Sequence, residues 1–220
     1  MKFRRYAVYF TPENSSFADA GSTWLGWDIT SAVRHESPAP DLTKRPRKYG
    51  FHATIKPPFS LAKGQDEGRL RDALADLCAA AKPVALEGLR LNRIGSFFAF
   101  TAIGETRQLA ALASRVVRDL DQFRAPPSEQ ELARRRNAPL SPQEEENLKQ
   151  WGYPYVMDSF RFHMTLTGPV GRYEGDPVRR QLQAHFADCD LTPFSINTLT
   201  LVGEDEEKLF HQIHRFHLNQ

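Results

Sequence analysis

Two short stretches of the chain share the pattern His-x-Thr, and residues of these types can carry out acid–base chemistry. His52 and Thr54 form the first pair, and His163 and Thr165 form the second. Imidazole titrates near neutral pH, so one ring can act as a neutral base while another acts as a charged acid. Each threonine adds a hydroxyl that can donate a hydrogen bond. Together these groups suit reaction at a phosphodiester, whose non-bridging oxygens need support as charge builds up.

The residues around each pair alternate between apolar and polar, which predicts a strand with one dry face and one polar face. The apolar positions are Phe51, Ala53 and Ile55 in the first stretch and Phe160, Phe162, Met164 and Leu166 in the second. A slip of one residue would bury the histidines, so the register is well specified. The alternation predicts that Lys56 lies on the face of His52. It also predicts that Arg161 and Thr167 lie on the face of His163.

The sequence that follows each pair also repeats. A helical pattern over 69–81 and a turn near Gly95 follow the first pair, and a helical pattern over 177–188 and a turn near Asp205 follow the second. Gly95 comes 43 residues after His52, and Asp205 comes 42 residues after His163. Self-similarity of this kind is typical of a duplicated unit. If the units pack about a pseudo-twofold axis, the two histidines face each other across one cleft.

The polar segment 125–158 interrupts this repeat. It contains two predicted helix starts at Ser128 and Ser141, each followed three residues later by a glutamate. It either connects the halves as a solvated helical hairpin or covers the cleft as a lid. Its run Arg134 to Arg136 is typical of a solvated helix face, although such a run can also steer an anionic substrate.

Composition excludes several classes of protein. The 220 residues carry a net charge of +2, too small to indicate a nucleic-acid or membrane partner by itself. Two cysteines form neither a disulfide framework nor a zinc site, and no apolar run approaches the length of a membrane span. We therefore expect a cytoplasmic monomer without a membrane partner. His211, His214 and His217 alternate faces on a strand, so no metal site is expected there.

The paired motifs, with their flanks, resemble those of the two-histidine phosphoesterase superfamily, which includes RNA cyclic phosphodiesterases and 2′-5′ RNA ligase-like proteins. The strings Tyr-Gly-Phe-His-Ala-Thr-Ile-Lys-Pro-Pro-Phe (49–59) and Phe-Arg-Phe-His-Met-Thr-Leu-Thr-Gly-Pro (160–169) are similar to a bacterial branch associated with phosphonate-utilisation operons. The stretches 5–9 and 24–28 fit that branch too, so the resemblance spans nearly the whole chain.

The resemblance implies an α+β fold: one bilobal domain over 1–220, built from duplicated strand–helix–hairpin units, with antiparallel sheets facing a central cleft and helices outside. The halves would span about 1–124 and 159–220, with 125–158 as a helical insertion. It also implies that His52 and His163 are catalytic, that Thr54 and Thr165 hold phosphate oxygens, and that neither a metal nor another cofactor takes part. Which histidine is the base stays open.

The leading hypothesis is a metal-independent cyclic phosphodiesterase that opens a small cyclic phosphate of the ribose or nucleotide type in phosphonate metabolism. Lys56 and Arg161 are candidates for binding the substrate phosphate, and Tyr6, Tyr155 and Thr167 for other substrate contacts. One alternative is RNA end processing, as a 2′,3′-cyclic phosphodiesterase or a 2′-5′ RNA ligase-like enzyme. The chain lacks the dense basic stripe that extended RNA binding needs. Another alternative is a non-catalytic nucleotide-binding regulatory module.

Overall fold

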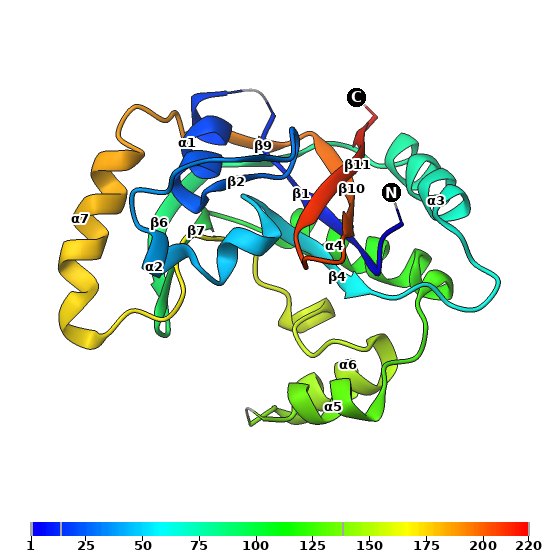
Figure 1. Ribbon diagram of the computed structural model, residues 1–220. Coiled ribbons are helices and arrows are strands. Elements are labelled where there is room, and N and C mark those ends of the chain that lie inside the picture. The colour runs from blue at the N-terminus through cyan, green and yellow to red at the C-terminus, as the bar shows by residue number, and fades with distance from the viewer. Residues whose placement is uncertain (1, 14, 138, 220) are drawn as a thin grey trace.

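A seven-stranded antiparallel sheet forms the centre of the computed structural model, which describes residues 2–13, 15–137 and 139–219 (Figure 1). The strand order is β11-β10-β1-β4-β8-β7-β6. The strands are β1 (Arg5–Phe10), β4 (Ala53–Phe59), β6 (Gly88–Ile94), β7 (Phe97–Ile103), β8 (His163–Thr165), β10 (Thr198–Glu204) and β11 (Phe210–His217). Two small ladders join β2 (Trp27–Asp28) to β3 (Val33–Arg34) and β5 (Val84–Leu86) to β9 (Phe194–Ile196). With the helices described next, the predicted α+β class is confirmed.

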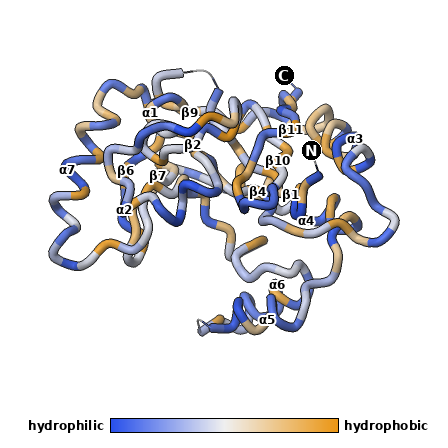
Figure 2. Tube along the Cα trace, viewed as in Figure 1, coloured by the Kyte–Doolittle hydropathy of each residue, from blue (hydrophilic) through white to orange (hydrophobic). Residues whose placement is uncertain are grey.

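Four amphipathic helices supply the apolar side of the core. They are α1 (Ser16–Leu25), α3 (Glu67–Ala79), α4 (Arg107–Asp119) and α7 (Gly175–His185). In Figure 2, hydrophobic and hydrophilic positions alternate along α3 and α7, as expected for helices with one buried face. Their buried residues form one cluster with the apolar faces of the central strands, represented by Val8, Ile55 and Met164. The opposite face of β4 and β8 is therefore left free for polar residues.

Each half of the chain has the predicted order of strand, helix and hairpin. The first runs β4, α3, β5, β6, β7, and the second runs β8, α7, β9, β10, β11. The hairpins are exchanged, however, because β6–β7 follows β4 in sequence but lies beside β8. Likewise β10–β11 follows β8 but lies on the far side of β1, which pairs with β4. The halves therefore meet within one continuous sheet, through direct pairing of β4 with β8.

The insertion over residues 125–158 forms α5 (Glu129–Arg135), α6 (Pro142–Trp151) and the short 3-10 helix η3 (Met157–Ser159). Both predicted helix starts are confirmed: the Ser128 hydroxyl accepts from the backbone of Glu131, and Ser141 and Glu144 form a reciprocal capping box. The remaining short helices are α2 (Pro40–Thr43), η1 (Pro46–Tyr49), η2 (Asp121–Phe123) and η4 (Arg172–Glu174). Across the described ranges, no helix has both the length and the apolar character needed to cross a bilayer.

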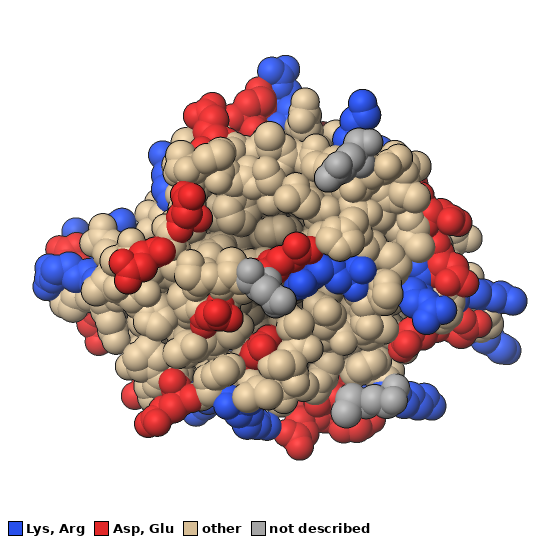
Figure 3. All heavy atoms as spheres, turned by 90° about the horizontal axis from the view of Figure 1, so that it is seen from above, with Lys and Arg blue, Asp and Glu red and all other residues tan. Residues whose placement is uncertain are grey.

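The charges on the molecule's surface are mixed in sign. On the face shown in Figure 3, acidic and basic side chains are interspersed, with uncharged surface between them. This distribution agrees with the small net charge of +2.

A β-bulge in β4 separates Lys56 from the face that carries His52. Tyr9 of β1 pairs with Thr54, whereas the adjacent Val8 pairs with Lys56, so β4 has one extra residue at this point. An extra residue reverses the side to which the next side chain points. Lys56 consequently shares the core face of Val8. The alternation of the sequence had predicted the opposite face, because it assumes an unbroken ladder.

Lys56 is held on the core side by specific contacts. Its side chain is 2% exposed, and its Nζ donates a 3.0 Å hydrogen bond to the carbonyl oxygen of Val117. Its nearest carboxylate is Asp121, at 3.7 Å, and its ammonium lies 5.2 Å from the centre of the Phe59 ring. Burial lowers the pKa of Lys56 from 10.5 to about 8, an effect that the Asp121 carboxylate opposes.

Substituting Lys56 with Met tests this burial. From about pH 8 to about pH 10, the unfolded chain binds a proton that the folded protein lacks, so Lys56 makes the folded protein more stable as pH rises. We expect the wild type to gain about 1 kcal/mol over Lys56→Met for each pH unit in that range. Urea unfolding of both proteins at several pH values measures the difference. Parallel stability profiles would contradict the buried placement.

Candidate functional site

One register pair between β4 and β8 brings the two His-Thr pairs together. Ala53 and Met164 are directly opposite each other in this antiparallel pairing. Continuing the register places His52 opposite Thr165 and Thr54 opposite His163. Side chains opposite each other in an antiparallel pair, and those two residues apart on one strand, share a face. All four predicted groups therefore lie on the same side of the sheet, as neighbours within it and not on two facing sheets.

Backbone geometry just before β4 orients the His52 ring. Gly50 has φ +68°, a conformation that favours glycine, and an added Cβ would lie 2.7 Å from the side chain of Ile29. The Gly50 carbonyl oxygen lies 2.9 Å from Nδ1 of His52. A carbonyl can only accept, so Nδ1 carries a proton and donates it. In the neutral ring, Nε2 is then the acceptor, and the Thr54 hydroxyl lies 3.1 Å from it.

Aromatic rings enclose His52. The Tyr9 ring stacks on it with centroids 3.8 Å apart and an interplanar angle of 25°, and the Tyr49 ring lies 6.2 Å away. The pKa of His52 is lowered to about 4, mainly by burial and to a smaller extent by the nearby charge of His163, while the hydrogen bond to Gly50 acts in the opposite direction. His52 is therefore neutral near pH 7, with its basic nitrogen beside Thr54.

His163 repeats the orientation but not the enclosure. Its Nδ1 donates a 2.7 Å hydrogen bond to the carbonyl oxygen of Arg161, two residues earlier, as His52 does to Gly50. The remaining nitrogen, Nε2, is the one that can exchange a proton with a ligand. Phe97 is an aromatic neighbour of His163, with ring centroids 6.1 Å apart, a looser contact than the stacked tyrosine on His52.

Two cavities adjoin the His-Thr pairs. The larger, about 400 Å³, is lined by residues of β1, β4 and β8, by residues just before β4, and by the insertion: Arg5, Tyr9, Tyr49, His52, Thr54, Pro57, Pro58, Arg134, Arg135, Tyr153 and Thr165. The smaller, about 280 Å³, is mostly walled by apolar groups: Arg45, Pro46, Tyr49, Gly50, His52, Phe97, Thr165, Thr167, Gly168 and Pro169. His52 and Thr165 line both cavities and Thr54 lines the larger one, so a ligand in either cavity would contact His52, whereas His163 is not among the residues that line them.

The structure adds a residue that sequence reasoning did not select. Tyr153 reaches the larger cavity from the insertion, together with Arg134 and Arg135, whose run the sequence had described as a solvated helix face or a guide for an anionic substrate. The sequence had suggested Tyr155, which is 46% exposed and packs its ring edge-on against Tyr153 at 5.8 Å. Of the other lining residues, Tyr49 is the one that the sequence could have indicated, because it lies only three residues before His52. The choice between the two insertion tyrosines depended on how the insertion folds back.

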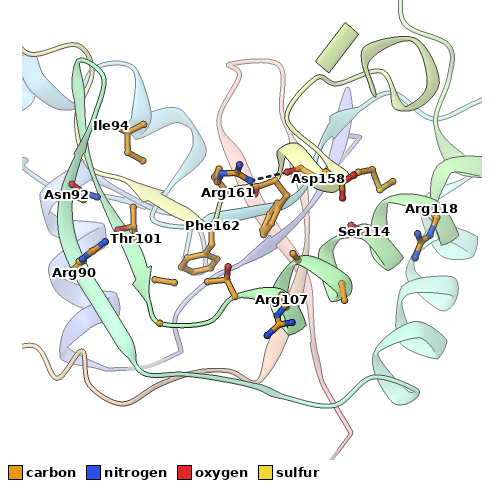
Figure 4. A pocket seen from close by; sticks show the side chains of 17 residues that line it. Arg90, Asn92, Ile94, Thr101, Arg107, Ser114, Arg118, Asp158, Arg161 and Phe162 are labelled. Atoms are coloured by element: carbon orange, nitrogen blue, oxygen red, sulfur yellow. Dashed lines mark hydrogen bonds between the residues drawn. The ribbon is translucent and has the colours of Figure 1, made fainter. Parts of the chain in front are cut away.

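Arg161 lies beside the site and not between the histidines. Its Nη1 donates hydrogen bonds to the carbonyl oxygens of Asp158, at 3.0 Å, and Phe160, at 2.7 Å. The side chain borders a separate cavity of about 910 Å³ formed with β6, β7 and α4, where Figure 4 shows it directed toward Asp158. Other labelled residues of that cavity are Arg90, Asn92, Thr101, Arg107, Ser114 and Arg118.

The other two suggested contacts have structural partners. Tyr6 is buried in the core cluster, and its hydroxyl lies 3.2 Å from a carboxylate oxygen of Glu67. Thr167 is 1% exposed, and its hydroxyl accepts a 3.0 Å hydrogen bond from the backbone N–H of Phe98. Thr167 borders the smaller cavity, whereas Tyr6 points to the opposite side of the sheet.

A family model described as a protein of unknown function, DUF1045, matches residues 54–211. The chain belongs to the DUF1045 family. The match begins at Thr54 and includes His163 and Thr165, so most of the residues described above lie within it.

Two curated relatives of this DUF1045 chain are named ribose 1,5-bisphosphate phosphokinase PhnN. The protein from Janthinobacterium sp. (strain Marseille) is 38% identical over 222 residues, covering 91% of this chain and 48% of the relative. The protein from Laribacter hongkongensis (strain HLHK9) is 33% identical over 215 residues, covering 92% of this chain and 48% of the relative. The chain thus spans about half the length of the curated relatives that it matches.

Solved structures similar to the DUF1045 chain include E. coli LigT complexed with 3′-AMP and with phosphate. Their sequence identities are 11% and 10%, both TM-scores are 0.47, and each comparison covers 100% of both chains.

Nuclear magnetic resonance of the histidine rings tests the asymmetry between the two pairs. Because burial is the main cause of the lowered pKa of His52, we expect the ring to titrate near pH 4. The pKa should stay low in a His163→Gln variant. That variant should raise the pKa of His52 only slightly, because it removes the smaller, electrostatic contribution. A His52 ring that titrates at the ordinary histidine value of about 6.5 would contradict the enclosure by Tyr9 and Tyr49.

Proposed function

We propose that this protein is a cyclic phosphodiesterase that uses His52 and His163 for acid–base catalysis without a metal ion. The observation that supports it best is the Ala53–Met164 register, which puts two imidazoles and two threonine hydroxyls on one face of the sheet, where His52 and Thr165 border two cavities. General acid and base groups placed together are what in-line hydrolysis of a phosphodiester requires. The sequence resemblance to two-histidine phosphoesterases points to the same chemistry.

In the proposed reaction, neutral His52 is the base. Its Nε2 removes a proton from a water molecule as the water oxygen attacks phosphorus. His163 in its charged form donates the Nε2 proton to the departing ribose oxygen as the phosphorus–oxygen bond breaks. Thr54 and Thr165 donate hydrogen bonds to the non-bridging oxygens, which gain charge in the transition state. Proton exchange with solvent then restores both rings, and the product is a phosphate monoester.

The names of the curated relatives support a ribose substrate. Those proteins are named as kinases of ribose 1,5-bisphosphate, and this chain accounts for about half of their length. If the bond between phosphorus and O2 of ribose 5-phosphate 1,2-cyclic phosphate is hydrolysed, the product is ribose 1,5-bisphosphate. A phosphodiesterase of this kind would therefore supply the substrate of the kinase activity. We accordingly place the protein in phosphonate metabolism, in line with the sequence resemblance.

A nucleoside 2′,3′-cyclic phosphate is the second candidate substrate. The smaller cavity has aromatic and proline walls, from Tyr49, Phe97 and Pro169, and it shares His52 and Thr165 with the larger one. Such walls can stack on a base. The interspersed charges on the face in Figure 3 give no support to a long RNA ligand.

Turnover of defined substrates decides among these candidates. We expect the purified protein to open the 1,2-cyclic phosphate of ribose 5-phosphate, and 31P nuclear magnetic resonance monitors this reaction. Nucleoside 2′,3′-cyclic phosphates and an RNA ending in a cyclic phosphate are the comparison substrates. Substituting either His52 or His163 with Ala should lower kcat by about 10²–10⁴-fold, the usual contribution of a general acid or base. Circular dichroism checks folding, and unchanged turnover in both variants would refute catalysis by these histidines.

The pH profile tests the assignment of the base. Because the pKa of His52 is lowered to about 4, its neutral form persists above that pH, and kcat/KM should fall only as pH drops toward 4. At higher pH, kcat/KM should fall again because the general acid has to be in its protonated form, giving a bell-shaped profile. A monotonic profile, or an acidic limb at the ordinary histidine value, would overturn the roles assigned here.

A further inference from the structure

We propose that the insertion binds a second phosphate group of the substrate, through Arg135 assisted by Arg134. This inference rests on the proposed function, because it places a terminal phosphate beside the cyclic phosphate that the His-Thr pairs would hold. It gives residues 125–158 a role in specificity that the duplicated units do not supply.

The larger cavity has walls of two chemical kinds. The sheet contributes His52, Thr54 and Thr165, while the insertion contributes Arg134, Arg135 and Tyr153. Its volume of about 400 Å³ falls within the range of about 300–1,000 Å³ that is usual for small-molecule sites. One small ligand with two phosphates can therefore contact both walls together.

Arg135 differs from the neighbouring arginines in having no acidic partner among the described residues. Its guanidinium carbon lies 4.5 Å from the centre of the Tyr153 ring, and its Nε is buried without a hydrogen-bond acceptor in the described part of the chain. Arg136, by contrast, is bound to Glu145 of α6 at 2.7 Å. Arg5, on the same cavity, donates to Glu204 at 2.6 Å. A cation that is oriented by a ring and unpaired is prepared for an anionic ligand.

Phosphate suits this cation better than a monodentate anion. The planar guanidinium presents several donors in a fixed fork, which matches two oxygens of one phosphate. Arg134 lines the same cavity and adds a second positive charge there. Its ion pair with Glu131 is long, at 3.5 Å, and solvent-exposed, so this pair neutralises the charge of Arg134 only weakly. A ribose with a cyclic phosphate and a 5-phosphate carries both anionic groups that these walls would bind.

The preference for the second phosphate is the quantity to measure. We compare kcat/KM for the 1,2-cyclic phosphate of ribose with that for the same compound bearing a 5-phosphate. The wild type should prefer the 5-phosphorylated compound, and Arg135→Gln should lower that preference by about 10–100-fold, as expected for loss of a charge-assisted contact. Arg135→Lys should restore part of it. Arg136→Gln, at the residue that follows the last residue of α5, is the matched control and should keep the wild-type preference.

Other outcomes separate this inference from the proposed function. If Arg135→Gln and Arg136→Gln leave the preference equally unchanged, the subsite is refuted while the phosphodiesterase activity stands. If neither cyclic compound is hydrolysed, the proposed function fails, and calorimetric binding of ribose 5-phosphate then tests the subsite alone. Binding that is weakened by Arg135→Gln but retained in His52→Ala supports the subsite. Equal binding by wild type and Arg135→Gln overturns it.

Discussion

Hydrogen bonding between β4 and β8 is the constraint from which the arrangement of the site follows. Because Ala53 lies opposite Met164, the residues on either side of each fall on one face and next to one another. A slip of one residue on either strand would turn that strand's histidine and threonine into the core. The apolar neighbours resist such a slip, since Ala53 and Met164 are fully buried among the helices. Core packing therefore maintains the position of the polar groups.

The exchange of hairpins explains how so short a strand as β8 is held. Its three residues lie between β4 and the β7 strand that follows the other His-Thr pair in sequence. On the β7 side, Ala99, Phe100 and Thr101 pair with Thr165, Met164 and His163. Just beyond the strand, the buried Trp24 indole donates a 2.8 Å hydrogen bond to the carbonyl oxygen of Leu166. The hairpin of the first half thus supports the His-Thr strand of the second half.

The same motif has different surroundings in the two halves. In both, Nδ1 donates to the carbonyl oxygen two residues earlier, so the duplicated backbone sets the same ring tautomer twice. Only His52 stacks on Tyr9, which comes from β1, a strand without a counterpart in the second half. That added strand encloses His52 and lowers its pKa. An asymmetry of this kind is what acid–base catalysis by two identical side chains needs.

Features that depend on residues close together in the chain could be predicted from the amino-acid sequence. The His-Thr pairs, the strand periodicity around them, the caps at Ser128 and Ser141, and the repeated order of elements are all local. The side to which Lys56 points was decided by the tertiary structure, because the bulge in β4 exists only relative to β1. Tertiary structure also selected Tyr153 and Arg135 for the cavity, since their positions depend on how a helical insertion folds back onto a distant sheet. Local periodicity carries no information about which element lies opposite, and it is that opposing element which distinguishes a solvated arginine from one that lines a cavity.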